Sequence, residues 1–144
     1  MTRRPAVLFL CTHNAARSQM AEALLRRDAG SRFAAFSAGL QPTEVHPMTR
    51  QVLTEVGIDP TGLRAKGVQE FMGKTTVRYA IVVCQETQAA CPRVFPFALE
   101  VLRWPFNDPT RAEGGRDLQL ARFRRVLSDI EARIGAWLRE SGPP

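Results

Sequence analysis

The chain has 144 residues, of which 44% are hydrophobic and 24% charged, and this composition is typical of one globular domain with a sizeable core. No apolar stretch approaches the roughly 18 residues that a transmembrane helix needs, so we expect a cytoplasmic protein with no membrane segment. The net charge of +6 suggests nucleic acid as a first partner. However, the arginines are scattered among acidic residues, so we predict no nucleic-acid interface, and the positive field instead favours the approach of small oxyanions.

The first half of the chain alternates predicted strands with predicted helices. The apolar run at residues 6–10 predicts a buried strand, and the good helix formers at 19–27 predict a helix. A second strand is predicted at 32–37. The spacing of apolar residues at 48–56 predicts a helix that ends at Gly57.

The second half continues the same alternation. After a polar connection at residues 59–66, we predict a short helix at 68–72, a strongly buried strand at 79–84 and a weaker strand at 100–104. A long amphipathic helix is predicted at 118–138 because its apolar residues advance by three or four positions. This stripe consists of Leu120, Phe123, Leu127, Ile130, Ile134 and Leu138, and we interpret it as core.

Alternating strands and helices predict a single α/β domain over residues 1–144, with a parallel sheet covered on both faces. Ligands of such folds bind at the carboxyl ends of the strands. Cys11 follows the first strand, Cys84 ends another, and Asn107 and Asp108 follow a third. We therefore expect these chemically reactive residues to lie on one rim of the sheet.

The segment from Cys11 to Ser18 reads Cys-Thr-His-Asn-Ala-Ala-Arg-Ser and joins the first strand to the first helix. The amides of such a turn can converge on an anion at the positive end of the helix. Arg17 can bind two oxygens of a tetrahedral oxyanion, and the same field favours the reactive thiolate form of Cys11. The alternative is that Cys11 is only a small buried residue at a strand end, but the flanking strand and helix favour the oxyanion loop.

Asp108 follows Asn107 and precedes Pro109 after the predicted fourth strand. An aspartate on this rim can protonate a leaving oxygen as a general acid. The alternative is a simple turn at Asp108-Pro109. Because the segment faces a Cys-x5-Arg loop, we favour the catalytic role, and we assign no role to His13 or His46.

Cys84 and Cys91 are separated by six residues. They can be two unrelated cysteines, and their spacing is wrong for a zinc knuckle, so we predict no metal. The redox interpretation is more economical: Cys84 attacks an adduct of Cys11, and Cys91 then attacks the Cys11–Cys84 disulfide. Both sulfurs must reach disulfide distance in turn, so we predict that the segment between them is among the most mobile.

On these residues the chain resembles the thioredoxin-coupled arsenate reductases built on the low-molecular-weight tyrosine phosphatase fold. The resemblance rests on residues 11–22, 37–39, 55–59, 83–92 and 104–109, which come in the family's order and spacing. It implies a four-stranded parallel sheet flanked by helices, with an oxyanion-binding loop after the first strand. It also implies reduction of arsenate to arsenite, as in arsenic detoxification, with thioredoxin as the reductant and no cofactor.

The resemblance also implies roles for individual residues. Cys11 matches the nucleophile and Asp108 the general acid, while Cys84 and Cys91 match the relay pair that thioredoxin reduces. The implied catalytic set is Cys11, Arg17, Cys84, Cys91 and Asp108, and the implied oxyanion-binding set is Thr12, His13, Asn14, Ala15, Ala16, Arg17 and Ser18. Within the second set, Arg17 matches the oxyanion clamp, Ser18 a hydroxyl that stabilises the thiolate and Asn14 a residue that shapes the loop.

Three positions depart from the family pattern. Ala16 stands where relatives often have cysteine or serine, which removes any disulfide partner inside the loop. His13 stands where some relatives have glycine. Some relatives hold a potassium ion near the loop, and Lys66 stands where they have an aspartate ligand. Our hypothesis is that the Lys66 ammonium replaces the ion by pairing with Glu22.

Two alternative functions remain open at this stage. A low-molecular-weight tyrosine phosphatase would use the same loop, but it needs neither Cys84 nor Cys91, and this chain has Thr110 and Arg111 where phosphatases usually carry tyrosine. A non-enzymatic protein that binds oxyanions or nucleic acid through the loop is the other alternative, and it does not explain three cysteines at these positions. We therefore predict an arsenate reductase with weak phosphatase side activity, acting as a monomer.

Overall fold

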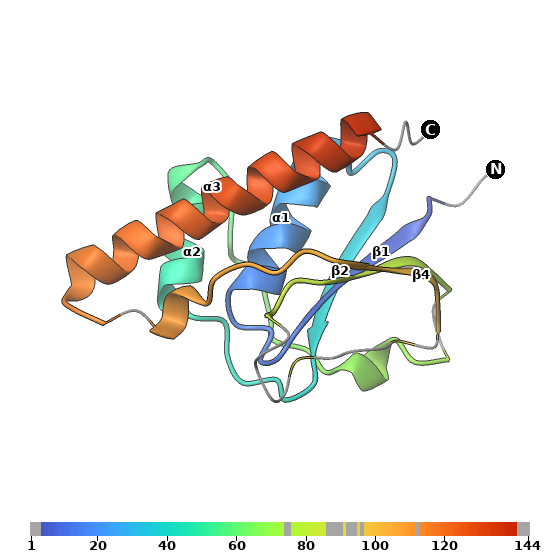
Figure 1. Ribbon diagram of the computed structural model, residues 1–144, viewed down its shortest axis with the longest axis horizontal. Coiled ribbons are helices and arrows are strands. Elements are labelled where there is room, and N and C mark those ends of the chain that lie inside the picture. The colour runs from blue at the N-terminus through green and yellow to red at the C-terminus, as the bar shows by residue number, and fades with distance from the viewer. Residues whose placement is uncertain are drawn as a thin grey trace.

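The computed structural model describes residues 4–73, 76–85, 91, 95, 97–111 and 113–140 (Figure 1). Four strands form one sheet in the order β2-β1-β3-β4, and every neighbouring pair is parallel. The strands are β1 (Ala6–Cys11), β2 (Ala34–Gly39), β3 (Val77–Val82) and β4 (Ala98–Arg103). The expected four-stranded parallel sheet is therefore confirmed.

The central strand β1 is buried along all of its length. This explains why its sequence is a continuous apolar run, since a central parallel strand is covered on both faces. At the edge of the sheet, β4 is largely exposed and pairs only with β3. The weaker sequence signal of this strand reflects its position at the edge.

Helical segments lie on both faces of the sheet, and all three described α-helices share one of them. The helices α1 (Arg17–Ala29), α2 (Pro47–Glu55) and α3 (Arg116–Glu140) contact one another on one face, and the short 3₁₀ helix η1 (Val68–Glu70) lies on the opposite side (Figure 1). Just after η1, Phe71 packs against Phe36 of β2, with the ring centroids 5.5 Å apart. A second 3₁₀ turn, η2 (Pro109–Arg111), follows β4. No described helix is long and apolar enough to cross a membrane.

The apolar stripe of α3 is buried in the core as predicted. Five of its six residues are buried, and Leu138 packs against the core from a partly buried position. Trp137 is also buried, although the stripe did not include it. Its ring lies between 5.2 and 5.8 Å from those of Phe33, Tyr79 and Trp104, so it joins α3 to the sheet.

The element boundaries differ slightly from the sequence prediction. β3 ends at Val82, before Cys84, although the amide of Val83 still donates to the carbonyl of Leu10 at 2.9 Å. The pairing with β1 therefore continues one residue beyond the strand, and Cys84 begins the following segment. Similarly, α1 begins at Arg17, two residues earlier than predicted, because the amide of Met20 donates to the carbonyl of Ala16.

Candidate active site

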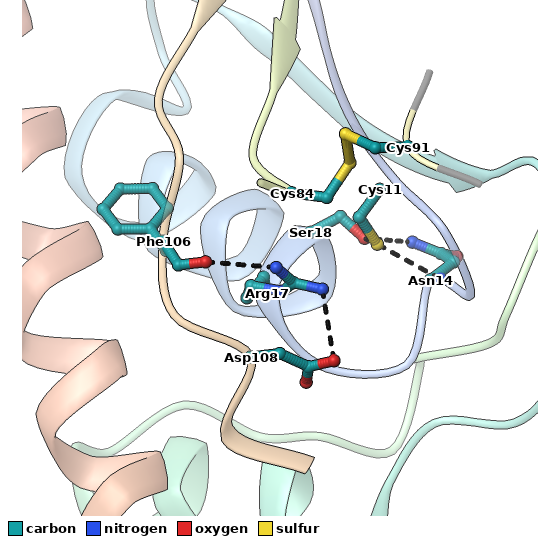
Figure 2. Close-up of a disulfide and its surroundings, with 8 residues drawn as sticks. All are labelled: Cys11, Asn14, Arg17, Ser18, Cys84, Cys91, Phe106 and Asp108. Atoms are coloured by element: carbon teal, nitrogen blue, oxygen red, sulfur yellow. Dashed lines mark hydrogen bonds and ion pairs between the residues drawn. A yellow bond between two sulfur atoms is a disulfide. The ribbon is translucent and has the colours of Figure 1, made fainter. Parts of the chain in front are cut away.

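The three predicted reactive segments meet at the carboxyl ends of the strands. Cys11 is the last residue of β1, and Cys84 follows β3. The amide of Phe106, beyond β4, donates to the carbonyl of Val83 at 3.2 Å, which ties the segment that carries Asp108 to the one that carries Cys84. Figure 2 shows Cys11, Arg17, Asp108 and the Cys84–Cys91 pair gathered around this rim.

Cys11 is the nucleophile candidate, and its side chain is 3% exposed. Its Sγ lies 2.8 Å from Ser18 Oγ and accepts a hydrogen bond from the amide of Asn14 at 3.2 Å. A cavity of about 20 Å³ opens beside the sulfur, enough for at least one water-sized group. Its walls come from the loop and from the turn after β4: Cys11, His13, Ala15, Ala16, Arg17, Asp108 and Thr110.

The loop from Cys11 to Ala16 turns its carbonyl groups away from this cavity. Each of these six carbonyls accepts a hydrogen bond from surrounding structure, and the donors are Leu40, Gln41, Thr43, Gln19, His46, Thr49 and Met20. Because a peptide N–H points opposite to the carbonyl of the same peptide plane, the loop amides are directed inward. Such a concave array of amides at the start of a helix is an anion-binding site.

Two residues allow this tight turn. Asn14 adopts a left-handed backbone conformation with φ 54°, which asparagine tolerates better than most residues. Gly39 of β2 packs directly against the loop, where a Cβ would lie 2.7 Å from the carbonyl oxygen of Thr12. A larger residue at position 39 would displace the loop backbone.

Arg17 lies at the mouth of the cavity and is 5% exposed. One guanidinium nitrogen donates to the carbonyl of Phe106 at 3.1 Å, and the other lies 3.5 Å from Asp108 Oδ2 (Figure 2). Burial lowers the pKa of Arg17 below its ordinary value, while the charges of Asp108 and Cys11 oppose this change. These contacts hold the guanidinium fork beside the sulfur, where it can bind two oxygens of one anion.

Asp108 faces Arg17 across the cavity. Burial raises its pKa more than any other single influence, but hydrogen bonds from Thr110 and the charges of Arg17 and Arg111 together hold the pKa below the ordinary value. Its Oδ1 accepts from the amide of Thr110 at 3.0 Å and from the Thr110 hydroxyl at 2.6 Å. In the unliganded site, Asp108 is therefore a carboxylate.

Lys66 lies in a buried polar cluster behind the loop. Its Nζ donates to the carbonyl of Arg64 at 3.0 Å and lies 3.5 Å from Glu22 Oε1 and 3.4 Å from Ser37 Oγ. Burial lowers the pKa of Lys66, and Glu22 opposes this effect. The ion pair that the potassium hypothesis requires is thus present in the structure.

Cys84 and Cys91 form a disulfide with their Cα atoms 5.8 Å apart, and Cys11 is a free thiol. This is the pairing that the relay predicted as its product. Figure 2 draws the disulfide at the rim that carries Cys11. The predicted mobility of the intervening segment concerns residues 86–90, which lie outside the described residues.

His13, which the resemblance places in the oxyanion-binding set, lines the cavity. The structure also places residues to which sequence reasoning gave no role. His46 caps α2 by accepting from the amide of Met48 at 3.1 Å. Gln19 contacts the backbone of the loop, and the carbonyl of Phe106 accepts from Arg17. Backbone partners of this kind leave no signal in residue type, so a sequence pattern could not reveal them.

Comparison with known proteins finds relatives that match nearly the whole chain. The family model described as low molecular weight phosphotyrosine protein phosphatase matches residues 6–141. An arsenate reductase of Halalkalibacterium halodurans is 33% identical over 132 residues, covering 91% of this chain and 93% of the relative. An arsenate reductase of Bacillus subtilis is 30% identical, with 89% and 91% coverage.

Solved structures give the same result. An arsenate reductase in the phosphate-binding state superposes with a TM-score of 0.76 at 26% identity, over 94% of this chain and 98% of the other. A thioredoxin-dependent arsenate reductase of Corynebacterium glutamicum superposes with a TM-score of 0.69 at 29% identity, over 96% of this chain and 62% of that longer chain.

Proposed function

The chain belongs to the low-molecular-weight phosphotyrosine protein phosphatase family, and we propose that within it the chain is a thioredoxin-coupled arsenate reductase. The observation that carries this proposal is the combination of a free Cys11 inside an oxyanion loop with a Cys84–Cys91 disulfide on the same rim. A phosphatase has no use for the second feature.

The first step is nucleophilic attack. Arsenate binds to the inward loop amides and to the guanidinium of Arg17, and the Cys11 thiolate attacks its arsenic atom. A sulfur–arsenic bond forms, and an arsenate hydroxyl group, which already carries one proton, leaves as water after accepting a second proton from Asp108. The negative charge of the bound oxyanion makes protonation of Asp108 easier, which prepares it for this role.

The second step is the reduction. The Cys84 thiolate attacks the sulfur of Cys11, and the electron pair of the sulfur–arsenic bond passes to arsenic. Arsenic goes from the +5 to the +3 state and leaves as arsenite, while two thiols become the Cys11–Cys84 disulfide. Ala16 offers no competing thiol inside the loop, so the oxidising equivalent must pass to Cys84.

The third step restores the nucleophile. Cys91 attacks the sulfur of Cys84, and Cys11 leaves as a thiolate, which Ser18 Oγ and the amide of Asn14 are placed to stabilise. The product is the Cys84–Cys91 disulfide. A dithiol protein of the thioredoxin class then reduces this disulfide and closes the cycle.

Phosphatase activity is a side reaction of the same pocket. Phosphate and arsenate share shape and charge, so Cys11, Arg17 and Asp108 suffice to cleave a phosphomonoester. However, the turn after β4 carries Thr110 and Arg111 where an aromatic wall for a phenyl ring would be needed. We expect this activity to be weak.

The proposal is tested by NADPH consumption when arsenate is added to the protein with thioredoxin and thioredoxin reductase. The wild type should turn over continuously, Cys91→Ser should stop after one turnover, and Cys11→Ser should be inert. Absence of arsenate-dependent consumption by the wild type would count against the proposal. An aryl-phosphate assay would then show whether the chain is a phosphatase instead.

We further propose that the enzyme acts as a monomer in the cytoplasm. All of the proposed catalytic side chains come from one chain, and the disulfide must be reduced in every cycle, as a reducing compartment allows. Light scattering at micromolar concentration tests the first point, since a mass well above 16.1 kDa would contradict it. Cell fractionation tests the second.

A further inference from the structure

Gln19, on the first turn of α1, is fully buried beneath the oxyanion loop and is not among the residues with a proposed role. Its Nε2 lies 2.8 Å from Asn14 Oδ1, 3.1 Å from the carbonyl of Asn14 and 2.8 Å from the carbonyl of Arg64. One side-chain amide therefore contacts both the backbone and the side chain of the only described non-glycine residue that has a left-handed conformation.

Gln19 and the backbone amide of Lys66 together determine which way the side chain of Asn14 faces. Asn14 Oδ1 accepts from Gln19 Nε2 and also from the amide of Lys66 at 2.9 Å. Its Nδ2 consequently faces the other way and donates to Ser18 Oγ at 2.8 Å. An exchange of the two Asn14 atoms would place an NH₂ group against two donors, which the network forbids.

This orientation leaves the Ser18 proton available for the next hydrogen bond. Ser18 Oγ accepts from Asn14 and lies 2.8 Å from Cys11 Sγ. Because a Cys11 thiolate has no proton to give, the serine hydroxyl is the donor to it. A hydroxyl that donates to sulfur stabilises the thiolate over the thiol. The donor direction therefore runs from Gln19 through Asn14 and Ser18 to Cys11.

The side-chain oxygen of Gln19 gives a second indication that this residue has a functional role. Among the described residues its Oε1 is buried without a hydrogen-bond partner. An unsatisfied buried acceptor lowers the free energy of unfolding, and methionine would fill nearly the same volume without a polar atom. Packing alone therefore does not explain an amide at this position, whereas the donation from its NH₂ group to Asn14 and Arg64 does.

We propose that Gln19 is a positioning residue that fixes Asn14 so that Ser18 donates to the Cys11 thiolate. The inference rests on the proposed function in that it assigns Cys11 as the nucleophile. A well-stabilised thiolate serves the cycle twice, because Cys11 is the attacking group in the first step and the leaving group in the third.

The test is the pH titration of Cys11 in the full chain with Cys84→Ser and Cys91→Ser, where Cys11 is the one remaining thiol. Thiolate absorbance near 240 nm and the rate of iodoacetamide alkylation are followed against pH. Gln19→Met should raise the midpoint by about one pH unit, a tenfold loss of thiolate at lower pH, while the melting temperature stays equal or rises.

Two further variants complete the experiment. Gln19→Glu should raise the midpoint at least as far, because its carboxylate cannot donate to Asn14. The control is Gln51→Met on α2, whose Oε1 accepts from Arg116 away from the loop, and it should leave the midpoint unchanged. An unchanged midpoint in both Gln19 variants, whatever their melting temperatures, overturns the inference. Since the titration uses no arsenate, its outcome is independent of whether the chain reduces arsenate.

Discussion

The guanidinium of Arg17 and the carboxylate of Asp108 lie 3.5 Å apart across the mouth of the Cys11 cavity. In the unliganded site this pair neutralises part of the positive charge that attracts an oxyanion. A bound oxyanion pairs with the guanidinium of Arg17 in place of Asp108, and it places negative charge beside the Asp108 carboxylate. The same pair therefore keeps Asp108 ionised before binding and favours its protonation afterwards.

This relationship predicts opposite effects of Asp108→Asn on binding and on chemistry. Phosphate should bind at least as tightly as to the wild type, because a competing negative charge is removed. The first turnover with arsenate should slow about 100-fold, since the leaving oxygen loses its proton donor. Calorimetry with phosphate and quenched-flow measurement of arsenite release check the two effects, and an unchanged rate would refute the role of Asp108 as general acid. Asp129→Asn, which removes an exposed carboxylate on α3, is the matched control.

Gly39→Ala should damage the loop without touching any reactive side chain. The new Cβ would lie 2.7 Å from the carbonyl oxygen of Thr12 and 2.8 Å from the amide nitrogen of Asn14, and neither backbone atom can rotate away. We expect a loss of about 1–3 kcal/mol in the free energy of unfolding together with weaker phosphate binding. Gly62→Ala is the control, because a Cβ there meets nothing within 4 Å. Equal melting temperatures and phosphate affinities in the two variants would contradict this account of the loop.

The pattern of apolar residues along the sequence predicted those strands and helices whose burial depends on consecutive residues alone. The apolar run of β1 and the stripe of α3 are properties of consecutive residues, and both are buried as expected. The predicted stripe continued from Ile134 to Leu138 and so left out Trp137, which lies three residues after Ile134 and is the more buried of the two. Trp137 packs against Phe33 and Tyr79 of other segments, and a pattern within one helix does not show such contacts.

The reactive residues were predictable for a different reason. Cys11 and Asp108 each follow a predicted strand and Cys84 ends one, and parallel topology brings such positions together. The support of the loop was not predictable, because the residues that satisfy its carbonyls act mainly through backbone groups. Gly39 is the clearest example of what the sequence could not predict, because its neighbours in the sequence do not indicate that its Cα lies against the loop.

The cap of α2 predicts a pH dependence of stability. His46 Nδ1 accepts from the amide of Met48, so the ring must be neutral there, and burial lowers the pKa of His46 although Asp108 opposes this. The unfolded chain protonates first as pH falls below about 6.5, so this histidine lowers the free energy of unfolding between that pH and its folded pKa.

The replacement His46→Asn should remove this part of the pH dependence, because asparagine caps a helix without titrating. His46→Ala should also remove it and lose about 1 kcal/mol at pH 7. Urea unfolding from pH 5 to 8 checks both. Identical pH profiles for the wild type and His46→Asn would show that other groups account for the dependence.

The buried pair of Lys66 and Glu22 predicts an enzyme that does not respond to potassium. The ammonium lies between Glu22, Ser37 and the carbonyl of Arg64, and so occupies the place where a monovalent cation could contact these oxygens. Wild-type melting temperature and arsenate turnover should therefore be equal in potassium and sodium chloride. Strong stabilisation of the wild type by potassium over sodium would contradict the replacement hypothesis.

Lys66→Met should leave Glu22 buried with Arg26 and Ser37 as its remaining partners among the described residues. We expect a loss of about 2–3 kcal/mol in the free energy of unfolding, at the low end for a broken buried pair because those partners remain. Since the vacated site keeps its carboxylate and carbonyl oxygens, potassium should restore part of the loss. The double variant Lys66→Met with Glu22→Gln should be more stable than Lys66→Met and should not respond to potassium. This result is expected because the buried charge of Glu22, and not the lost packing of the lysine side chain, is what a bound cation would stabilise.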